Sequence, residues 1–163
     1  MKTYREMCRF PLALILAVGC STALAQAPAA GTAAGTLTVK GNAIKLAHAY
    51  AFVDQGDKRK LVILLLTEQP VPAATWKSDS DIMMYRMDKN PLHGVAFRLD
   101  DQREVVSVDY YEGRFPTGTS GIFALKLDGP SGKTLAGTAK STEAAAKLSE
   151  PVSLNVSFSA TLK

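Results

Sequence analysis

Two histidines, His48 and His93, are the only imidazole bases in the chain. Serine hydrolysis needs a nucleophile, a base and a group that orients the base, and the sequence has no Gly-x-Ser-x-Gly turn to present such a nucleophile. His48 falls in an alternating apolar segment, which favours a buried structural histidine. His93 stands at the entrance of an expected strand and is the better candidate for a general base, with Asp100 or Asp101 as its helper.

Three methionines, Met83, Met84 and Met87, have the spacing that brings side chains together on one face of a helix. Thioethers bind Cu(I), so copper handling is one hypothesis. The same spacing is typical of a methionine patch that packs a helix onto a sheet, and packing is the interpretation we favour. Asp79 and Asp81 lack the continuation of a calcium-binding loop, and no metal or other cofactor is predicted.

Aromatic residues gather in two parts of the sequence, residues 69–90 and residues 110–115. They would line a cleft if the first segment folded over the hairpin that precedes the second. The candidate ligand-binding or partner-binding residues are Trp76, Tyr85, Tyr110, Tyr111, Arg114 and Phe115. Aromatic side chains beside an arginine suit a glycan, a peptide or an envelope protein. A rim of half-buried aromatic residues at the sheet ends is the alternative. Residues 112–121, rich in glycine, are expected to form a binding loop.

Residues 1–25 have the pattern of a bacterial secretory signal peptide. A basic start precedes an apolar run over residues 10–18, and Ala23, Leu24 and Ala25 form a small-x-small exit. The residues before Cys20 also resemble a lipoprotein processing box, after which Cys20 would become a lipidated N-terminus. The expected location is therefore periplasmic or extracellular, with a lipid anchor in the envelope as the alternative. A membrane contact is expected only through Cys20.

The 163-residue chain has a formal net charge of +4. Loss of residues 1–25 would remove three basic residues and one acidic residue, leaving 16 basic and 14 acidic residues and a net charge of +2. These charges alternate in sign and form no polybasic patch, which argues against a nucleic-acid partner. Cleavage would also remove both cysteines, so the exported domain would contain no disulfide and no thiol nucleophile.

Residues 36–163 are expected to form a single β domain, preceded by a flexible leader of small residues over 26–35. Period-two alternation recurs along the domain and is clearest in 152–162, which predicts strands with one buried face. Residues 61–66 form a continuous apolar run, typical of a strand buried on both faces. Residues 69–90 contain a short helical insertion that begins after Ser78. About eight strands in hairpins predict a mainly β fold, an antiparallel β-sandwich, with a small β-barrel as the alternative.

Three stretches of strand and turn residues resemble uncharacterised exported bacterial β-sandwich proteins. They are Gly41 to Ala51, Leu64 to Pro72 (LLLTEQPVP) and Val156 to Ala160 (VSFSA). The resemblance implies a β fold and an exported location, and it brings no catalytic residues. The leading hypothesis is an exported noncatalytic β domain that binds a partner or a small ligand. The alternatives are an envelope hydrolase that uses His93 and a periplasmic copper binder that uses methionines.

Overall fold

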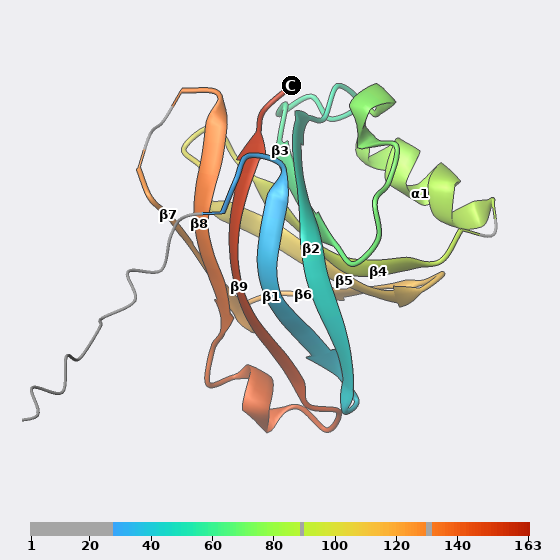
Figure 1. Cartoon of the computed structure of the whole chain (residues 1–163), viewed down its shortest axis with the longest axis vertical. Coiled ribbons are helices and arrows are strands. Elements are labelled where there is room, and N and C mark those ends of the chain that lie inside the picture. Colours follow the sequence, from blue (N-terminus) through green and yellow to red (C-terminus); the bar gives the residue numbers. More distant parts are fainter. Residues whose placement is uncertain (1–27, 89, 130–131) are drawn as a thin grey trace, which may run out of the picture.

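A computed structural model describes residues 28–163, except residues 89 and 130–131. Nine antiparallel strands form one sheet in the order β6-β5-β4-β3-β2-β1-β9-β8-β7 (Figure 1). The strands are β1 (Thr32–Val39), β2 (Asn42–Val53), β3 (Val62–Thr67), β4 (Leu92–Leu99), β5 (Val105–Gly113), β6 (Pro116–Thr119), β7 (Phe123–Leu127), β8 (Thr134–Ser141) and β9 (Val152–Thr161). One helix, α1 (Asp79–Met87), and two single 3-10 turns, Ala73–Thr75 and Ala145–Lys147, accompany them. The mainly β, antiparallel prediction with one short helical insertion is confirmed.

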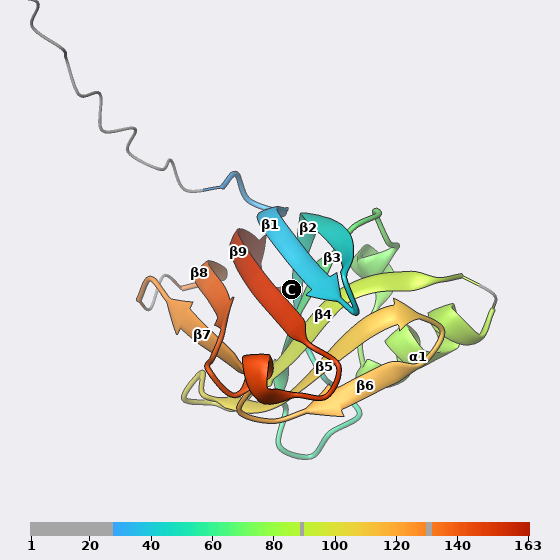
Figure 2. The ribbon, with the colours of Figure 1, turned by 90° about the horizontal axis from the view of Figure 1, so that it is seen from below.

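The sheet curls strongly, so strands that are far apart in the ladder approach each other across its concave side (Figure 2). The rings of Tyr110 on β5 and Phe123 on β7 lie 6.4 Å apart, edge to face, although six strands separate β5 from β7 in the sheet order. Strands twist in a fixed sense, and a sheet of nine strands accumulates that twist into a curled surface. The two end strands, β6 and β7, are therefore brought toward the same side of the molecule.

Two apolar clusters lie on opposite faces of this sheet. The larger one fills the concave side and includes Leu37, Leu64, Phe97 and Phe158. The smaller one lies under α1 on the outer face and includes the residues Phe52, Ile63, Leu65, Ile82, Leu92, Ala96 and Tyr111. Every residue of β3 is buried because this strand has one cluster on each side. The predicted central strand, buried on both faces, is confirmed.

The N-terminal hairpin begins earlier and turns earlier than the sequence pattern predicts. Strand β1 starts at Thr32, inside the range that we expect to be a flexible leader. Small residues belong here because β9 lies close: a Cβ on Gly35 would meet Asn155 O at 2.2 Å. The turn is made by Lys40 and Gly41, both with positive φ (52° and 84°), as in a type I′ turn. The dipeptide Gly41-Asn42 in the sequence predicts the turn one residue later, but Asn42 is already part of β2.

The alternation from Ile44 to Phe52 in the sequence predicts one continuous apolar face, but strand β2 changes face halfway along its length. Ile44 and Leu46 point into the concave core, whereas Tyr50 and Phe52 belong to the outer cluster. The pairing of β1 with β2 shifts register in this part of the hairpin, as at a β-bulge. A bulge interrupts strict alternation, so His48 does not share the buried face of Leu46.

Helix α1 begins where its sequence predicts. The Asp81 carboxylate accepts hydrogen bonds from the backbone amides of Lys77 (2.7 Å) and Ser78 (2.8 Å), as well as from the Ser78 hydroxyl (3.1 Å). Amides at a helix N-terminus lack partners within the helix, and a carboxylate there also suits the helix dipole. At the other end, Asn90 Nδ2 donates to the Tyr85 carbonyl at 3.2 Å. Both ends of the insertion are thus closed by side chains.

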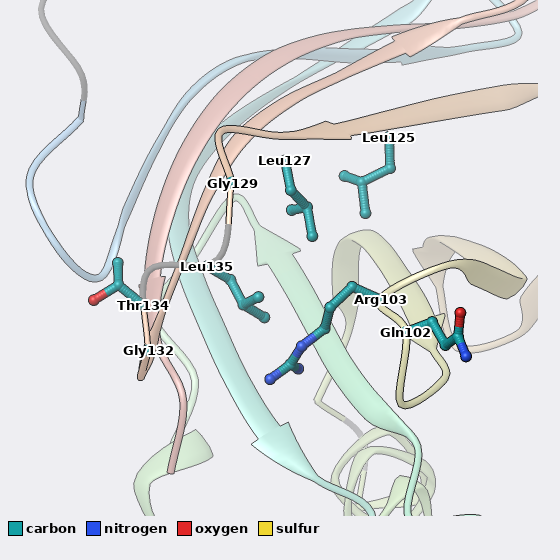
Figure 3. Close-up of a pocket in the computed structure, with 8 residues that line it drawn as sticks. All are labelled: Gln102, Arg103, Leu125, Leu127, Gly129, Gly132, Thr134 and Leu135. Atoms are coloured by element: carbon teal, nitrogen blue, oxygen red, sulfur yellow. The ribbon is translucent and has the colours of Figure 1, made fainter.

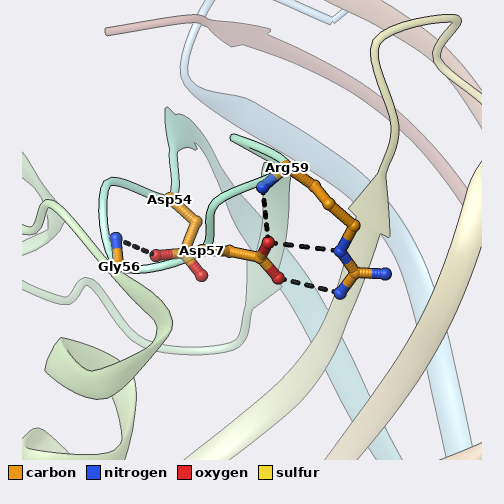
Figure 4. A network of polar contacts seen from close by, with 4 residues as sticks. All are labelled: Asp54, Gly56, Asp57 and Arg59. Carbon is orange, nitrogen blue, oxygen red and sulfur yellow. Dashed lines mark hydrogen bonds and ion pairs between the residues drawn. The ribbon is translucent and has the colours of Figure 1, made fainter.

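The β2–β3 connection is a solvated turn held by local polar contacts (Figure 4). Asp54 Oδ1 accepts the amide of Gly56 at 2.9 Å. The Asp57 carboxylate accepts the Arg59 amide at 2.7 Å and its guanidinium at 2.8 and 3.2 Å. This ion pair holds the pKa of Asp57 below its usual value. Arg59 of this basic turn is thus paired locally with Asp57.

The expected loop over residues 112–121 is largely a hairpin, which corrects the sequence interpretation. Residues Pro116–Thr119 form β6 and pair with residues 108–111 of β5. With β6 the sheet has nine strands, one more than the eight that the sequence predicts. Its side chains are mostly exposed, so it lacks the alternation that identifies a strand in sequence.

Candidate functional site

The six predicted binding residues do not form one cleft, because they lie on both faces of the sheet. Tyr110 points into the concave core against Phe123, while Tyr111 points into the cluster under α1. Neighbouring residues in a strand alternate between faces, so this separation follows from their positions in β5. Tyr110 therefore lies on the opposite face of the sheet from Tyr111, Trp76 and Tyr85.

Trp76 and Tyr85 belong to the packing under α1. Their ring centroids lie 5.4 Å apart, and Trp76 meets the edge of Phe52 at 6.3 Å. Both side chains are half-buried. Aromatic contacts of this kind stabilise packing by about 0.5–1.5 kcal/mol each beyond the area they bury. The alternative of half-buried rim aromatics describes these two residues well.

Arg86 connects α1 to the turn between β5 and β6. Its side chain is buried, with the guanidinium carbon 5.1 Å from the centre of the Tyr111 ring. Arg86 Nη1 donates to the Arg114 carbonyl at 2.8 Å. Burial raises the pKa of Tyr111 to about 12, so its hydroxyl stays neutral at physiological pH. The interaction fixes the β5–β6 turn beside the C-terminal half of the helix.

A second arginine, Arg98 on β4, forms a partly buried ion-pair network on the same outer face. Its Nη2 lies 2.7 Å from Asp79 of α1, and its Nη1 lies 2.7 Å from Asp109 of β5. Burial opposes the charged guanidinium, but these carboxylates hold the pKa of Arg98 above its ordinary value. Arg98 thus links α1 to β4 and β5, and both of its Nη atoms form ion pairs.

The three methionines lie on the exposed side of α1, which overturns the expectation that they pack the helix onto the sheet. Met83, Met84 and Met87 are 46%, 54% and 68% exposed, and Phe115 in the β5–β6 turn is 83% exposed. Ile82, Tyr85 and Arg86 make the packing contacts instead. We call Met83, Met84, Met87 and Phe115 the α1–Phe115 surface.

His93 lies far from the carboxylates of Asp100 and Asp101 that are expected to assist it. His93 begins β4, whereas Asp100 follows its end, about 23 Å away at a rise of ~3.3 Å per residue. Asp100 Oδ1 instead accepts the amides of Gln102 and Glu104 and shapes a turn. The cross-strand neighbour of His93 is Glu112, whose carboxylate accepts a hydrogen bond from Asn42 at 3.1 Å. His48 is half-buried and stacks on Tyr50.

A cavity of about 580 Å³ opens where the curled sheet brings β7 and β8 toward the β4–β5 turn (Figure 3). Leu125 and Leu127 of β7 and Leu135 of β8 form its apolar wall, and Arg103 extends from the opposite side. Arg103 Nη1 is buried and has no hydrogen-bond partner among the described residues. Leaving a charged donor unpaired costs roughly 1–3 kcal/mol or more. No motif in the sequence points to this site.

Arg103 also has an unusual backbone conformation. Its φ is +67°, in the left-handed region that favours glycine. A side chain there costs roughly 1–2 kcal/mol. Lys40 and Lys60 share a positive φ, so the conformation alone does not single out Arg103. The combination of this backbone with a buried Nη1 that no described residue pairs, beside a cavity, does.

The described residues contain no cluster of three or more His, Cys, Asp or Glu side chains that could hold a metal ion. None of the helices within residues 28–163, outside the gaps at 89 and 130–131, has the length and apolar character needed to cross a membrane. Cys20 and the predicted signal peptide lie outside the described residues. Comparison of the chain with protein-family models, with curated proteins and with solved structures gave no match. Function is therefore inferred from the geometry of this chain.

Proposed function

We propose that this protein is an exported, noncatalytic β domain that binds another protein of the bacterial envelope through the α1–Phe115 surface. The observation that carries the proposal is the exposure of four large apolar side chains on two adjoining elements. Contiguous exposed apolar residues are typical of protein interaction sites. Flexible thioethers adapt to a partner's shape. The hydrogen bond from Arg86 to Arg114 fixes the geometry between the two elements.

A protein partner suits this surface better than a glycan does. Glycan sites need exposed aromatic faces, and Phe115 is the exposed one among the aromatic candidates. Trp76 and Tyr85 are half-buried in the packing of α1, and Tyr111 is buried beneath Arg86. Arg114 is exposed beside Phe115 and could add a polar contact at the rim of an interface.

Site-specific photocrosslinking in the native host tests this proposal. A photoreactive residue at Met84 or at Phe115 is expected to give the same adduct mass. The control position is Lys45, an exposed residue of β2 outside the surface. Met83→Lys together with Met87→Lys should abolish the adduct, because a charge would be buried in an apolar interface. The proposal fails if neither position gives an adduct or if Lys45 gives the same one.

Export is a separate part of the proposal and rests on the pattern of residues 1–25. Intact-mass measurement of the protein recovered from its host should give an N-terminus at Gln26. A lipidated Cys20 would show that the chain is anchored in the envelope. Detection of the uncleaved chain in the cytoplasm alone would overturn export.

Cu(I) binding is a second candidate, favoured by the exposure of three thioethers within one helical segment. Replacing Met83, Met84 and Met87 by Leu keeps the surface apolar but removes the sulfur ligands. Copper handling predicts Cu(I) uptake, measured against a competing chelator, that this triple variant loses. Protein binding predicts that the triple variant retains the photocrosslink from Phe115. These two results separate the candidates.

A further inference from the structure

The cavity between β7, β8 and the β4–β5 turn is distinct from the α1–Phe115 surface. Its volume of about 580 Å³ lies within the ~300–1,000 Å³ range of small-molecule sites. Three leucines supply an apolar wall, and Arg103 is the one cationic side chain among the described lining residues. A site of this composition suits a ligand with one charged end and one apolar end.

The β4–β5 turn holds Arg103 in place. The Asp100 carboxylate accepts the amides of Gln102 at 2.9 Å and Glu104 at 2.8 Å. The Arg103 amide donates to the Asp100 carbonyl at 3.1 Å, and the Asp100 amide donates to the Glu104 carbonyl at 3.0 Å. The turn is thereby closed on both strands. A preorganised cation loses less freedom when a ligand binds.

The cavity has a cationic side at Arg103 and an apolar side formed by three leucines. Arg103 Nη1 is buried and has no hydrogen-bond partner among the described residues, whereas the guanidinium of Arg98 contacts two carboxylates. Guanidinium groups match carboxylates and similar anions in geometry and charge. Leu125, Leu127 and Leu135 offer hydrocarbon contacts and no charge.

We propose that this cavity binds a small amphiphilic anion, with a carboxylate against Arg103 and a hydrocarbon chain along Leu125, Leu127 and Leu135. Ion pairing at one end and apolar burial at the other would then both contribute to affinity. The proposal is independent of the α1–Phe115 surface, which lies on the outer face of the sheet. Loss of either site leaves the other testable.

Decanoate is a suitable probe, used below its micelle concentration with the purified protein as recovered from expressing cells. Calorimetric titration should show saturable binding of decanoate. Decanol has the same chain without the charge, and butyrate has the charge with little chain. Both are expected to bind at least roughly tenfold more weakly than decanoate, because each lacks one of the two contacts. Equal binding of decanoate and decanol would overturn the role of Arg103.

Two variants and one control assign the site. Arg103→Gln should weaken decanoate binding at least roughly tenfold, while Arg103→Lys should retain most of it because the charge remains. Lys126→Gln is the matched control, since Lys126 is an exposed cation on β7 outside the cavity lining. Leu127→Asn should weaken decanoate and decanol alike. Decanoate binding that is absent, or unchanged in Arg103→Gln, would refute the site.

Discussion

Arg98 and Arg103 lie in the same β4–β5 hairpin but have opposite environments. Arg98 is inserted between Asp79 and Asp109, both at 2.7 Å, on the face that α1 covers. Arg103 lies in the turn of the hairpin, with a buried Nη1 that no described residue pairs. The contrast indicates that these two arginine side chains have different roles. A cation with its anions already in place stabilises the fold, whereas a cation without one is available to a ligand.

The largest change in the free energy of unfolding should follow from removing the side chain of Arg98, which has two carboxylate partners. Arg98→Ala leaves the partly buried Asp79 and Asp109 without their cation and removes one link between α1 and β5, so the free energy of unfolding should fall by about 2 kcal/mol. Arg103→Ala should not destabilise the protein. Urea denaturation followed by circular dichroism measures both. Equal losses in the two variants would remove the distinction between the arginines.

Replacing Arg103, whose Nη1 has no partner among the described residues, should stabilise the protein. Arg103→Gly removes both the positive-φ strain and the buried, unpaired Nη1, so the free energy of unfolding should rise by about 1 kcal/mol or more. Arg103→Ala removes the charge but keeps the strain, and its gain should be smaller. Thermal unfolding compares the two variants with the parent. A lower melting temperature for Arg103→Gly would show that the guanidinium stabilises the unliganded fold.

The N-terminus of α1, the helix that Arg98 contacts, should be sensitive to acid because it depends on the carboxylate of Asp81. The hydrogen bonds to Lys77 and Ser78 hold the pKa of Asp81 below its usual 3.8. Their stabilisation is fully present above that unfolded value and is lost as pH falls through the lowered folded value. Asp81→Ala should cost about 1 kcal/mol at neutral pH. Its unfolding free energy should then depend less on pH below ~4 than that of the parent.

The control for this pH effect is Asp101→Asn, since Asp101 is exposed in the β4–β5 turn. Its stability profile should follow that of the parent. Chemical denaturation at a series of pH values provides the measurement. If Asp81→Ala and the parent lost stability in parallel below ~4, the cap would not be the acid-sensitive group.

The smallest effect on stability is expected at the α1–Phe115 surface. Met84→Ser changes a side chain that is 54% exposed, so the unfolding free energy should stay within about 0.5 kcal/mol of the parent. The same substitution should weaken the photocrosslink from Phe115. A loss of stability well above that range would mean that Met84 packs in the fold and is unavailable to a partner.

Local patterns allowed much of the fold to be predicted from sequence. The alternation of β9, the apolar run of β3 and the polar start of α1 each reflect interactions between residues close in the chain. The register shift between β1 and β2 and the ladder position of β6 were missed because their exposed or small residues give no clear period. The opposite orientations of Tyr110 and Tyr111 could have been predicted, since adjacent strand residues face opposite sides.

The sequence by itself determined most of the strands, the capped helix and the central position of residues 61–66, because these depend on periodicity and on short-range hydrogen bonds. Only the tertiary structure decided which residues meet across the curl. Arg103 and Leu125 are 22 positions apart in the numbering, and neither lies in a recognisable motif. The accumulated twist of nine strands brings them to one cavity. Exposure of the methionines was likewise decided by which side of α1 the sheet covers.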